Sequence, residues 1–253
     1  MQNKTILITG ASSGIGEATA RRFAQAGCKL VLNARNTEKL ASLKQELIRA
    51  YGSEVYVIPF DVRDFDAAER AFKSLPERFC EIDVLVNNAG LALGVDKEYE
   101  GCMKDYETMI DTNIKALLKM TQLVVPGMIA RQAGHVINIG SIAGEKAYPG
   151  GSVYCATKAA VKALSDGLRM DLYDTPVRVT NVKPGLVETN FSVVRYHGDK
   201  QKADKVYNNV KPLTGPDIAE VIFFVAAAPP HVQISEVEIL ATHQASAQMV
   251  WRG

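Results

Sequence analysis

The chain has 253 residues, of which 47% are hydrophobic and 23% are charged. These proportions are ordinary for a globular protein and argue against a disordered chain, and a chain of this length buries most of its apolar surface without disulfides or metals. With 29 basic and 28 acidic side chains the net charge is +1. We therefore expect no general attraction to nucleic acid or to an anionic membrane.

The cysteines and histidines, four of each, show no spacing typical of a metal site. We therefore expect no bound metal, and we interpret the cysteines as small buried hydrophobic residues in a reducing compartment. The first residues lack the apolar core of a signal peptide, and no segment reaches the ~18 apolar residues that a membrane span needs. These features predict a cytoplasmic protein with neither a membrane nor a nucleic acid as its partner.

Short β-branched segments alternate with longer segments of helical periodicity, which is typical of βαβ units. The predicted strands are Thr5–Thr9, Lys29–Ala34, Glu54–Pro59, Val84–Asn87, His135–Ile139, Arg178–Lys183 and Val237–Leu240. The predicted helices are Glu17–Ala26, Thr37–Ala50, Phe65–Ser74, Tyr106–Arg131, Thr157–Tyr173 and Pro216–Ala228. Several strands are apolar throughout, as in a sheet with helices on both faces. The pattern predicts an α/β fold of the Rossmann type, with a doubly wound parallel sheet of seven strands and residues 1–253 as a single domain.

A glycine-rich turn lies between the first predicted strand and the first predicted helix. Gly10 permits a tight turn, Gly14 allows the backbone to approach a pyrophosphate, and Gly16 allows close packing of helix on strand. The N-terminus of the helix presents unpaired N–H groups and the positive end of its dipole to the phosphates. We expect this turn to bind a dinucleotide through Gly10, Ser12, Ser13, Gly14, Ile15 and Gly16.

The end of the second predicted strand bears on the choice between NAD and NADP. A site that prefers NAD places an acid there, about 20 residues beyond the glycines, to bind the ribose hydroxyls. This chain has Asn33-Ala34-Arg35-Asn36 instead. Arg35 can pair with a 2′-phosphate, for which a guanidinium fork is well suited. The sequence therefore predicts NADP(H) as the cofactor, bound through Arg35 and Asn36, against the alternative that Arg35 is only a solvated residue.

A tyrosine and a lysine four residues apart, Tyr154 and Lys158, share one face of a helix. Oxidation of an alcohol requires a base that takes the hydroxyl proton as hydride leaves the carbon. A free tyrosine with a pKa of about 10 is a poor base near neutral pH, but a neighbouring ammonium and a positive nicotinamide ring would lower that pKa. In the reverse reaction the same phenol is the general acid. A tyrosine and a lysine at this spacing most often lie on the surface of a helix, so the surrounding motifs must show whether this pair is catalytic.

Six ordered motifs between Thr9 and Thr189 resemble those of the short-chain dehydrogenase/reductase family, beginning with the spacing GxxxGxG. The resemblance implies a catalytic tetrad of Asn113, Ser141, Tyr154 and Lys158. In such a tetrad the serine holds the substrate oxygen, and the asparagine holds a water that links the lysine to solvent. Further cofactor contacts implied by the resemblance are Asp61 and Val62 at the adenine, Asn87, Ala89 and Gly90 after the fourth strand, and Pro184, Gly185, Val187 and Thr189 at the nicotinamide, beside Tyr154 and Lys158.

Within the family, the chain is most similar to the NADP-dependent 3-hydroxy acid dehydrogenases. The similarity is carried by Gly134–Ser141, Tyr148–Tyr154, Thr189–Tyr196 and Pro230–Val232. It implies a small-molecule substrate such as serine, allo-threonine, 3-hydroxypropionate or malonic semialdehyde, and it implies a homotetramer.

A polar segment, residues 188–214, follows the sixth predicted strand and is longer than an ordinary connection, so we expect a substrate lid there. From Arg195 to Lys211 it has five basic and two acidic residues, a bias that suits a carboxylate substrate. We expect Arg195 to clamp that carboxylate, while Ser141 and Tyr154 contact the reacting group. A solvated charged loop is the alternative.

Two other functions stay open. The same residues would serve a reductase of another carbonyl compound, such as a 3-oxoacyl thioester, a sugar or a larger ketone. A non-catalytic NADP-binding sensor or scaffold is the alternative of another class, although such proteins usually lose a catalytic residue and this chain has all four. The only tryptophan, Trp251, lies near the chain end and predicts an ordered tail, for which a frayed terminus is the alternative.

Overall fold

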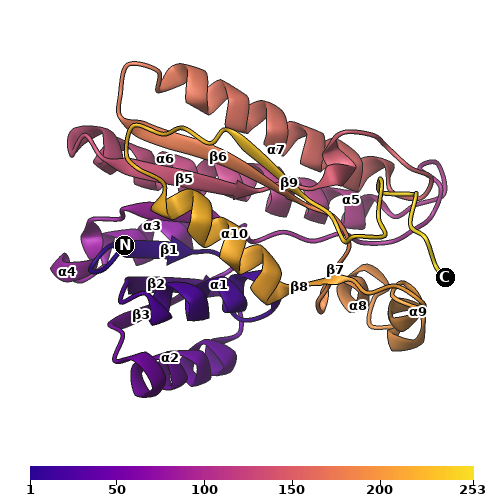
Figure 1. Ribbon diagram of the computed structural model, residues 1–253, viewed down its shortest axis with the longest axis horizontal. Helices are drawn as coiled ribbons and strands as arrows, with labels where there is room; N and C mark the ends of the chain where they lie inside the picture. Colours follow the sequence, from indigo (N-terminus) through magenta and orange to yellow (C-terminus); the bar gives the residue numbers. More distant parts are fainter.

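A parallel sheet of seven strands forms the centre of the molecule (Figure 1). The computed structural model describes residues 1–253, and the strand order is β3-β2-β1-β4-β5-β6-β9. The strands are β1 (Thr5–Ile8), β2 (Lys29–Ala34), β3 (Val55–Pro59), β4 (Val84–Asn87), β5 (Gly134–Ile139), β6 (Val177–Pro184) and β9 (Glu236–Ile239). The order reverses between β1 and β4, which is the topological switch point of a doubly wound sheet. The predicted fold class is confirmed.

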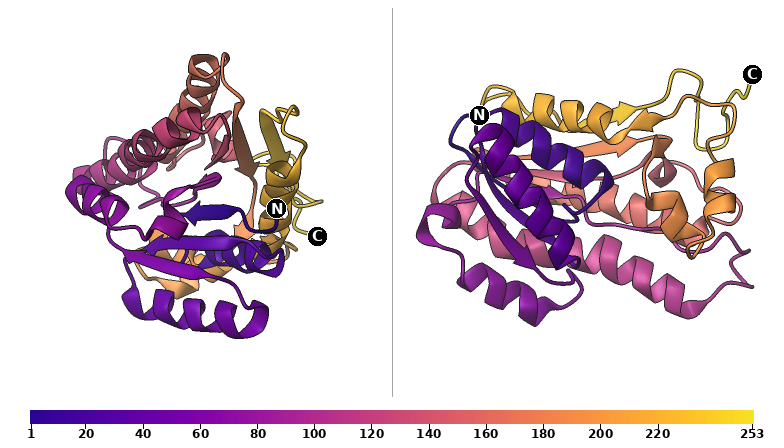
Figure 2. Two further views of the ribbon diagram at one scale, coloured as in Figure 1. Left: turned by 90° about the vertical axis from the view of Figure 1, so that its left-hand side faces the viewer. Right: turned by 90° about the horizontal axis from the view of Figure 1, so that it is seen from below.

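Helices cover both faces of the sheet because alternate strand residues point to opposite sides. On one face, Ile6 and Ile8 belong to a buried core that packs under α1 (Gly14–Gln25), α2 (Thr37–Tyr51) and α10 (Gly215–Ala227). On the other, Leu7 belongs to a second core under α3 (Phe65–Lys73), α4 (Glu77–Cys80), α6 (Ala116–Ala130) and α7 (Ser152–Asp171). The right-hand view of Figure 2 shows α10 along one side of the molecule and α6 along the other. None of the helices combines the length and the apolar character that a membrane crossing requires.

Two predicted helices differ from the observed ones near the expected site. The predicted helix Tyr106–Arg131 consists of α5 (Met103–Ile110), a π-helical turn at Asp111–Lys115 and α6. The predicted helix Thr157–Tyr173 begins five residues earlier, at Ser152, so Tyr154 lies in the first turn of α7. Gly151 is the N-cap and provides no side-chain cap, which explains why the sequence does not mark this beginning.

The segment 188–214 is not a plain loop. It contains α8 (Phe191–Arg195) and α9 (Lys200–Lys205), and its ends belong to a small parallel pair, β7 (Val187–Glu188) and β8 (Leu213–Thr214). This pair, which the sequence does not predict because two-residue strands have no periodicity, closes the base of the segment. The segment lies beyond the carboxyl ends of the sheet strands, close to the C-terminus (Figure 1). Arg252 of the tail donates hydrogen bonds to carbonyls of this segment, at Val206 and Asn208.

Candidate active site

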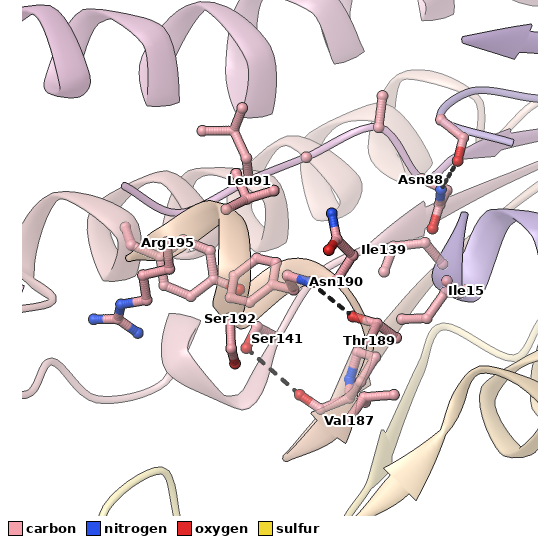
Figure 3. Close-up of a pocket in the computed structure, with 18 of the residues that line it drawn as sticks. Ile15, Asn88, Leu91, Ile139, Ser141, Val187, Thr189, Asn190, Ser192 and Arg195 are labelled. Atoms are coloured by element: carbon pink, nitrogen blue, oxygen red, sulfur yellow. Dashed lines mark hydrogen bonds between the residues drawn. The ribbon is translucent and has the colours of Figure 1, made fainter. Parts of the chain in front are cut away.

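A cleft of about 1100 Å³ opens at the carboxyl ends of the strands, where ligands bind in doubly wound α/β folds. The glycine-rich turn before α1 and the turns after β2 and β3 form one part of its wall. The other part is formed by Ser141, Tyr154, Lys158 and residues between Pro184 and Tyr196. Figure 3 shows Ser141, Val187, Thr189 and Arg195 on this wall. The tertiary structure therefore brings together motifs that are spread over most of the chain.

Most of the residues predicted to bind a cofactor line this cleft. They are Gly10, Ser12, Ser13, Gly14, Ile15, Arg35, Asn36, Asp61, Val62, Ala89, Gly90, Tyr154, Lys158, Pro184, Gly185, Val187 and Thr189. Two of the predicted residues, Gly16 and Asn87, are not in the lining. A Cβ on Gly16 would lie 2.4 Å from the carbonyl oxygen of Gly10, so this glycine permits the close packing of helix on turn. This geometry fits the packing role expected for Gly16. It does not fit a direct contact between Gly16 and a ligand in the cleft.

The side-chain amide of Asn87 is used inside the sheet, and a contact of this residue with the cofactor stays a prediction. Its Nδ2 donates to Oδ1 of Asn138 at 2.9 Å inside the sheet, so the side chain points away from the cleft. Its neighbour Asn88 lines the cleft and holds the glycine-rich turn in place, because its Nδ2 donates to the carbonyls of Thr9 (2.9 Å) and Gly10 (3.2 Å). The sequence shows two adjacent asparagines but not which of them faces the ligand, since this depends on the direction of each side chain at the end of β4.

The beginning of α1 has the properties of an anion site. Ser13 is the N-cap, and its side chain makes no hydrogen bond to the first turn, so the N–H groups of that turn lack a side-chain cap. Gly10 and Gly14 have φ values of +66° and +58°, a backbone conformation that favours glycine. A Cβ on Gly14 would lie 3.2 Å from the side chain of Thr189, across the cleft. The turn therefore presents bare backbone to the cleft, as a bound diphosphate requires.

The other end of the cleft is rich in guanidinium groups. The Arg35 side chain is 68% exposed, and its Nη1 lies 3.8 Å from Oδ2 of Asp61. Asn36 lines the cleft, but its side-chain oxygen caps α2 by accepting from the backbone N–H of Lys39 at 2.8 Å. Arg63, which the sequence analysis does not single out, also lines the cleft and pairs with Asp61. The arginine holds the pKa of the Asp61 carboxyl below its usual value, mainly through this hydrogen bond.

Tyr154 and Lys158 are both buried on α7. The Lys158 ammonium donates to the carbonyl of Ile139 at 2.8 Å and lies 5.9 Å from the centre of the Tyr154 ring. Burial lowers the pKa of Lys158 to about 8, because the ammonium loses solvation in this position. Gly90 lies close to two site residues, since a Cβ there would lie 3.2 Å from Oδ1 of Asn113 and 3.5 Å from the lysine Nζ.

Two opposed effects act on the pKa of Tyr154. Burial raises it above the ordinary value, because a phenolate loses solvation in this site, while a hydrogen bond with the Ser141 hydroxyl acts in the opposite direction. The Ser141 Oγ also accepts a hydrogen bond from the backbone N–H of Ala143 at 3.1 Å. This bond fixes the position of the hydroxyl oxygen on the cleft wall. The lowering expected from Lys158 together with a bound nicotinamide stays a prediction.

Asn113 lies beneath the cleft, in the π-helical turn. Its Oδ1 accepts from the backbone N–H of Leu91 at 2.9 Å, and its Nδ2 donates to the carbonyl of Leu91 at 2.8 Å and to Oγ1 of Thr157 at 3.0 Å. The amide thereby connects the turn after β4 to the helix that carries Tyr154 and Lys158. Single π-helical turns are frequent at functional sites. The water contact implied for Asn113 stays a prediction.

Arg195 also lines the cleft, at the end of α8. Its guanidinium donates from Nε to the carbonyl of Gly94 (3.3 Å), from Nη1 to the hydroxyl of Tyr148 (3.0 Å) and from Nη2 to the carbonyl of Gly150 (3.1 Å). In Figure 3 it points away from Ser141. Three of its five N–H groups are thus used to connect α8 to two loops, and two remain for a ligand. The carboxylate clamp stays a prediction.

Gln244 is a further residue that the sequence gives no signal for. Its Oε1 accepts from the backbone N–H of Leu186 at 2.7 Å, across 58 positions of the chain. A Cβ on Gly185 would lie 2.2 Å from the same oxygen, so the glycine allows this approach. The C-terminal tail therefore supports the segment from Pro184 to Thr189, which was predicted to bind the nicotinamide.

A doubly wound sheet with a glycine-rich anion site and a buried tyrosine–lysine pair defines a nucleotide-dependent oxidoreductase. The family model of the short chain dehydrogenases matches residues 4–199. An NADP-dependent 3-hydroxy acid dehydrogenase of Schizosaccharomyces pombe is 47% identical over 253 residues, which are 100% of this chain and 98% of that protein. A serine 3-dehydrogenase of Agrobacterium fabrum is 45% identical over 96% of both chains.

A solved structure supports the same relationship. The closed form of serine dehydrogenase complexed with NADP⁺ superimposes with a TM-score of 0.93 at 48% sequence identity, over 96% of this chain and 97% of that one. The chain belongs to the short-chain dehydrogenase family. It is an oxidoreductase of that family, and the resemblance stated from its motifs is confirmed.

Proposed function

We propose that this protein transfers a hydride between NADP(H) and a small 3-hydroxy acid or the corresponding carbonyl compound. The observation that carries the proposal is the convergence of Ser141, Tyr154 and Lys158 on the wall of a cleft whose opposite end presents the glycine-rich turn and Arg35. The names of the relatives, NADP-dependent 3-hydroxy acid dehydrogenase and serine 3-dehydrogenase, support the choice of substrate and cofactor.

The residues present fit NADP(H). The uncapped first turn of α1 and the bare backbone at Gly10 and Gly14 would hold the diphosphate, and Arg35 would hold the 2′-phosphate. The segment from Pro184 to Thr189 would hold the nicotinamide. When bound, the oxidised cofactor accepts the hydride in alcohol oxidation, and the reduced cofactor supplies it in the reverse direction.

The side chains around the reacting group divide the proton chemistry among them. Tyr154 takes the proton of the substrate hydroxyl during oxidation and returns it during reduction. The Lys158 charge stabilises the phenolate that forms, which the buried site otherwise disfavours. Ser141, which lines the same cleft as the tyrosine, donates to the substrate oxygen and keeps it beside the phenol.

Two features of the cleft favour a small anionic substrate. The ring of Phe191, on α8, packs against that of Tyr154 with 5.6 Å between their centres, which limits the space beside the phenol. The covering segment has a cationic bias, and Arg195 retains two free N–H groups at the cleft. A carboxylate next to a small hydroxyl-bearing carbon suits both features.

The test is a substrate panel followed by the absorbance of NADPH. Serine, allo-threonine and 3-hydroxypropionate are compared with neutral alcohols of similar size, 3-oxoacyl thioesters and sugars. We expect the highest kcat/KM with a 3-hydroxy acid, and a lower value with NAD⁺ than with NADP⁺. A preference for a thioester or a sugar would support the alternative reductase, and tight NADPH binding without any turnover would support a sensor or scaffold.

We also propose that the protein is a cytoplasmic homotetramer. Large apolar side chains are exposed on three helices, Met103 on α5, Leu118 on α6 and Phe224 on α10, and partner subunits would cover them. All four cysteines are free, which is typical of a reducing compartment. Light scattering after size exclusion is expected to give the mass of four chains, and the mass of one chain would contradict the proposal.

A further inference from the structure

The turn between β3 and α3 carries a preformed pair of charged side chains at the mouth of the cleft. Both carboxylate oxygens of Asp61 accept from one guanidinium, since Arg63 donates from Nε to Oδ1 at 3.0 Å and from Nη2 to Oδ2 at 2.6 Å. The backbone N–H of Arg63 also donates to Oδ1, at 3.0 Å. Two hydrogen bonds therefore hold the plane of this guanidinium, and the third holds the carboxylate against the backbone of the turn.

A second guanidinium faces the same carboxylate from the neighbouring strand end. Nη1 of Arg35 lies 3.8 Å from Oδ2 of Asp61, beyond hydrogen-bonding distance. The parallel pairing of β2 and β3 brings these strand ends together, with Ala34 opposite Pro59. Both arginines line the cleft, so two positive charges meet there with only one negative charge between them. The surplus positive charge lies where the ribose end of a dinucleotide is expected.

The pairing with the Arg63 guanidinium also reduces the number of hydrogen bonds that Asp61 can accept from a ligand. The family resemblance implies that this carboxylate binds the adenine, yet both of its oxygens already accept from Arg63, and only Oδ2 keeps capacity for a further hydrogen bond. The Nη1 of Arg63, in contrast, makes no hydrogen bond within the chain, and the side chain is 36% exposed. The open donor capacity at this position therefore belongs to the arginine.

We propose that Arg63 is a second binding residue for the 2′-phosphate of NADP(H) and that it shares this phosphate with Arg35. This inference rests on the proposed function and extends it to Arg63, which is not part of the family motifs found in the sequence. Two guanidiniums on one phosphate monoester match the geometry that arginine provides for such groups. Asp61 then positions the Arg63 fork, and its contact with Arg63 is more than a surface ion pair of small value.

The test uses the intact protein and two ligands that differ only in the 2′-phosphate, adenosine 2′,5′-bisphosphate and adenosine 5′-monophosphate. Calorimetry gives Kd for both in the wild type and in Arg63→Met, Arg63→Lys and Arg35→Met. Arg70→Met is the matched control, since Arg70 is exposed on the adjacent α3 and does not line the cleft. Thermal unfolding of each variant verifies that it is folded.

We expect Arg63→Met to weaken the bisphosphate about tenfold, the usual size for a lost hydrogen bond to a charged group, and to leave the monophosphate within about twofold. Arg63→Lys is expected to lie between them, because it keeps the charge and loses the fork. The salt dependence of bisphosphate binding is also expected to decrease in Arg63→Met, which a purely structural role of this side chain would not cause.

Two outcomes would overturn the inference. An unchanged ratio of the two Kd values in Arg63→Met, with both ligands unaffected, would make Arg63 a surface ion-pair residue only. Equal weakening of both ligands would assign it to the adenine pocket. These results are distinct from failure of the proposed function: equal affinity of the wild type for both ligands would remove the NADP preference itself. Turnover on a sugar alone would remove the proposed substrate while the phosphate site stands.

Discussion

The ammonium group of Lys158 donates a hydrogen bond to the carbonyl oxygen of Ile139 at 2.8 Å. This contact connects α7 to the last residue of β5, two positions before Ser141, so the helix and the strand end that carry the proposed catalytic side chains are fixed relative to one another. It also satisfies a lysine that has no carboxylate partner in its buried position. The charge is therefore available to the neighbouring phenol rather than neutralised by an acid.

Lys158→Met is expected to lower kcat/KM by about 10²- to 10⁴-fold, the range typical of lost acid–base catalysis, and to move the remaining activity to higher pH. The reason is that the phenolate of Tyr154 loses a positive charge that lies 5.9 Å from the centre of its ring. The measurement is the pH profile of NADP⁺ reduction with the best substrate of the panel. Lys162→Met, one turn further on α7 and paired with Glu145 outside the cleft, is the control. Equal profiles for the two variants would argue against this role of Lys158.

Arg195→Ala tests the carboxylate clamp. If its two free N–H groups bind the substrate, KM for 3-hydroxypropionate is expected to rise about tenfold, and KM for a neutral alcohol of similar size much less. Lys200→Ala, at the start of α9, controls for the general charge of the segment. An unchanged KM for the 3-hydroxy acid would remove the clamp. A similar rise for both substrates would indicate that Arg195 acts only by holding α8 to Gly94, Tyr148 and Gly150.

Because His135 is buried, we expect the free energy of unfolding to decrease at acidic pH. Its Nε2 is hydrogen-bonded to Oγ1 of Thr180 at 2.7 Å, and burial lowers its pKa to about 3. In the unfolded chain the pKa is about 6.5, so between these values the unfolded state binds a proton that the folded state does not. The folded state therefore loses about 1.4 kcal/mol per pH unit as the pH falls below 6.5.

The measurement for His135 is urea unfolding at pH 7 and pH 5. His135→Gln, which has no titrating group, is expected to lose about 2 kcal/mol less stability between these pH values than the wild type. His231→Gln, at an exposed position, is the control and is expected to follow the wild type. Parallel losses in the wild type and His135→Gln would show that the buried histidine does not drive the acid sensitivity.

Arg178 on β6 caps the end of α10 from a distance. Its Nη1 and Nη2 donate to four carbonyls, those of Val225, Ala226, Ala228 and Val232, at 3.0 to 3.4 Å. The last turn of this helix has no basic residue of its own. Arg178→Met is expected to lower the free energy of unfolding by about 2 kcal/mol. Chemical denaturation measures it, with Arg49→Met at the exposed end of α2 as the control, and equal stability of both variants would contradict the cap.

Local patterns in the sequence determined the strands, the glycine-rich turn and the positions of the tyrosine and lysine. Each of the seven strands of the sheet lies where its apolar segment predicts it, with ends that differ by at most one residue. Strand burial and helical periodicity depend on neighbouring residues, so short windows of the chain contain them. Gly10, Gly14 and Gly16 likewise lie within one short turn, and Tyr154 and Lys158 lie about one helical turn apart, so each pattern is visible in a short window of the sequence.

The tertiary structure alone decided which polar groups are free to meet a ligand. Asn87 is bonded inside the sheet to Asn138, both oxygens of Asp61 accept from Arg63, and most of the Arg195 donors are used by two distant loops. These pairings join elements that are up to 101 positions apart or depend on side-chain direction, and no local pattern encodes either. A polar side chain forms hydrogen bonds with the groups that are packed beside it in the folded chain. Only the tertiary structure therefore determines which of its donors and acceptors remain free for a ligand.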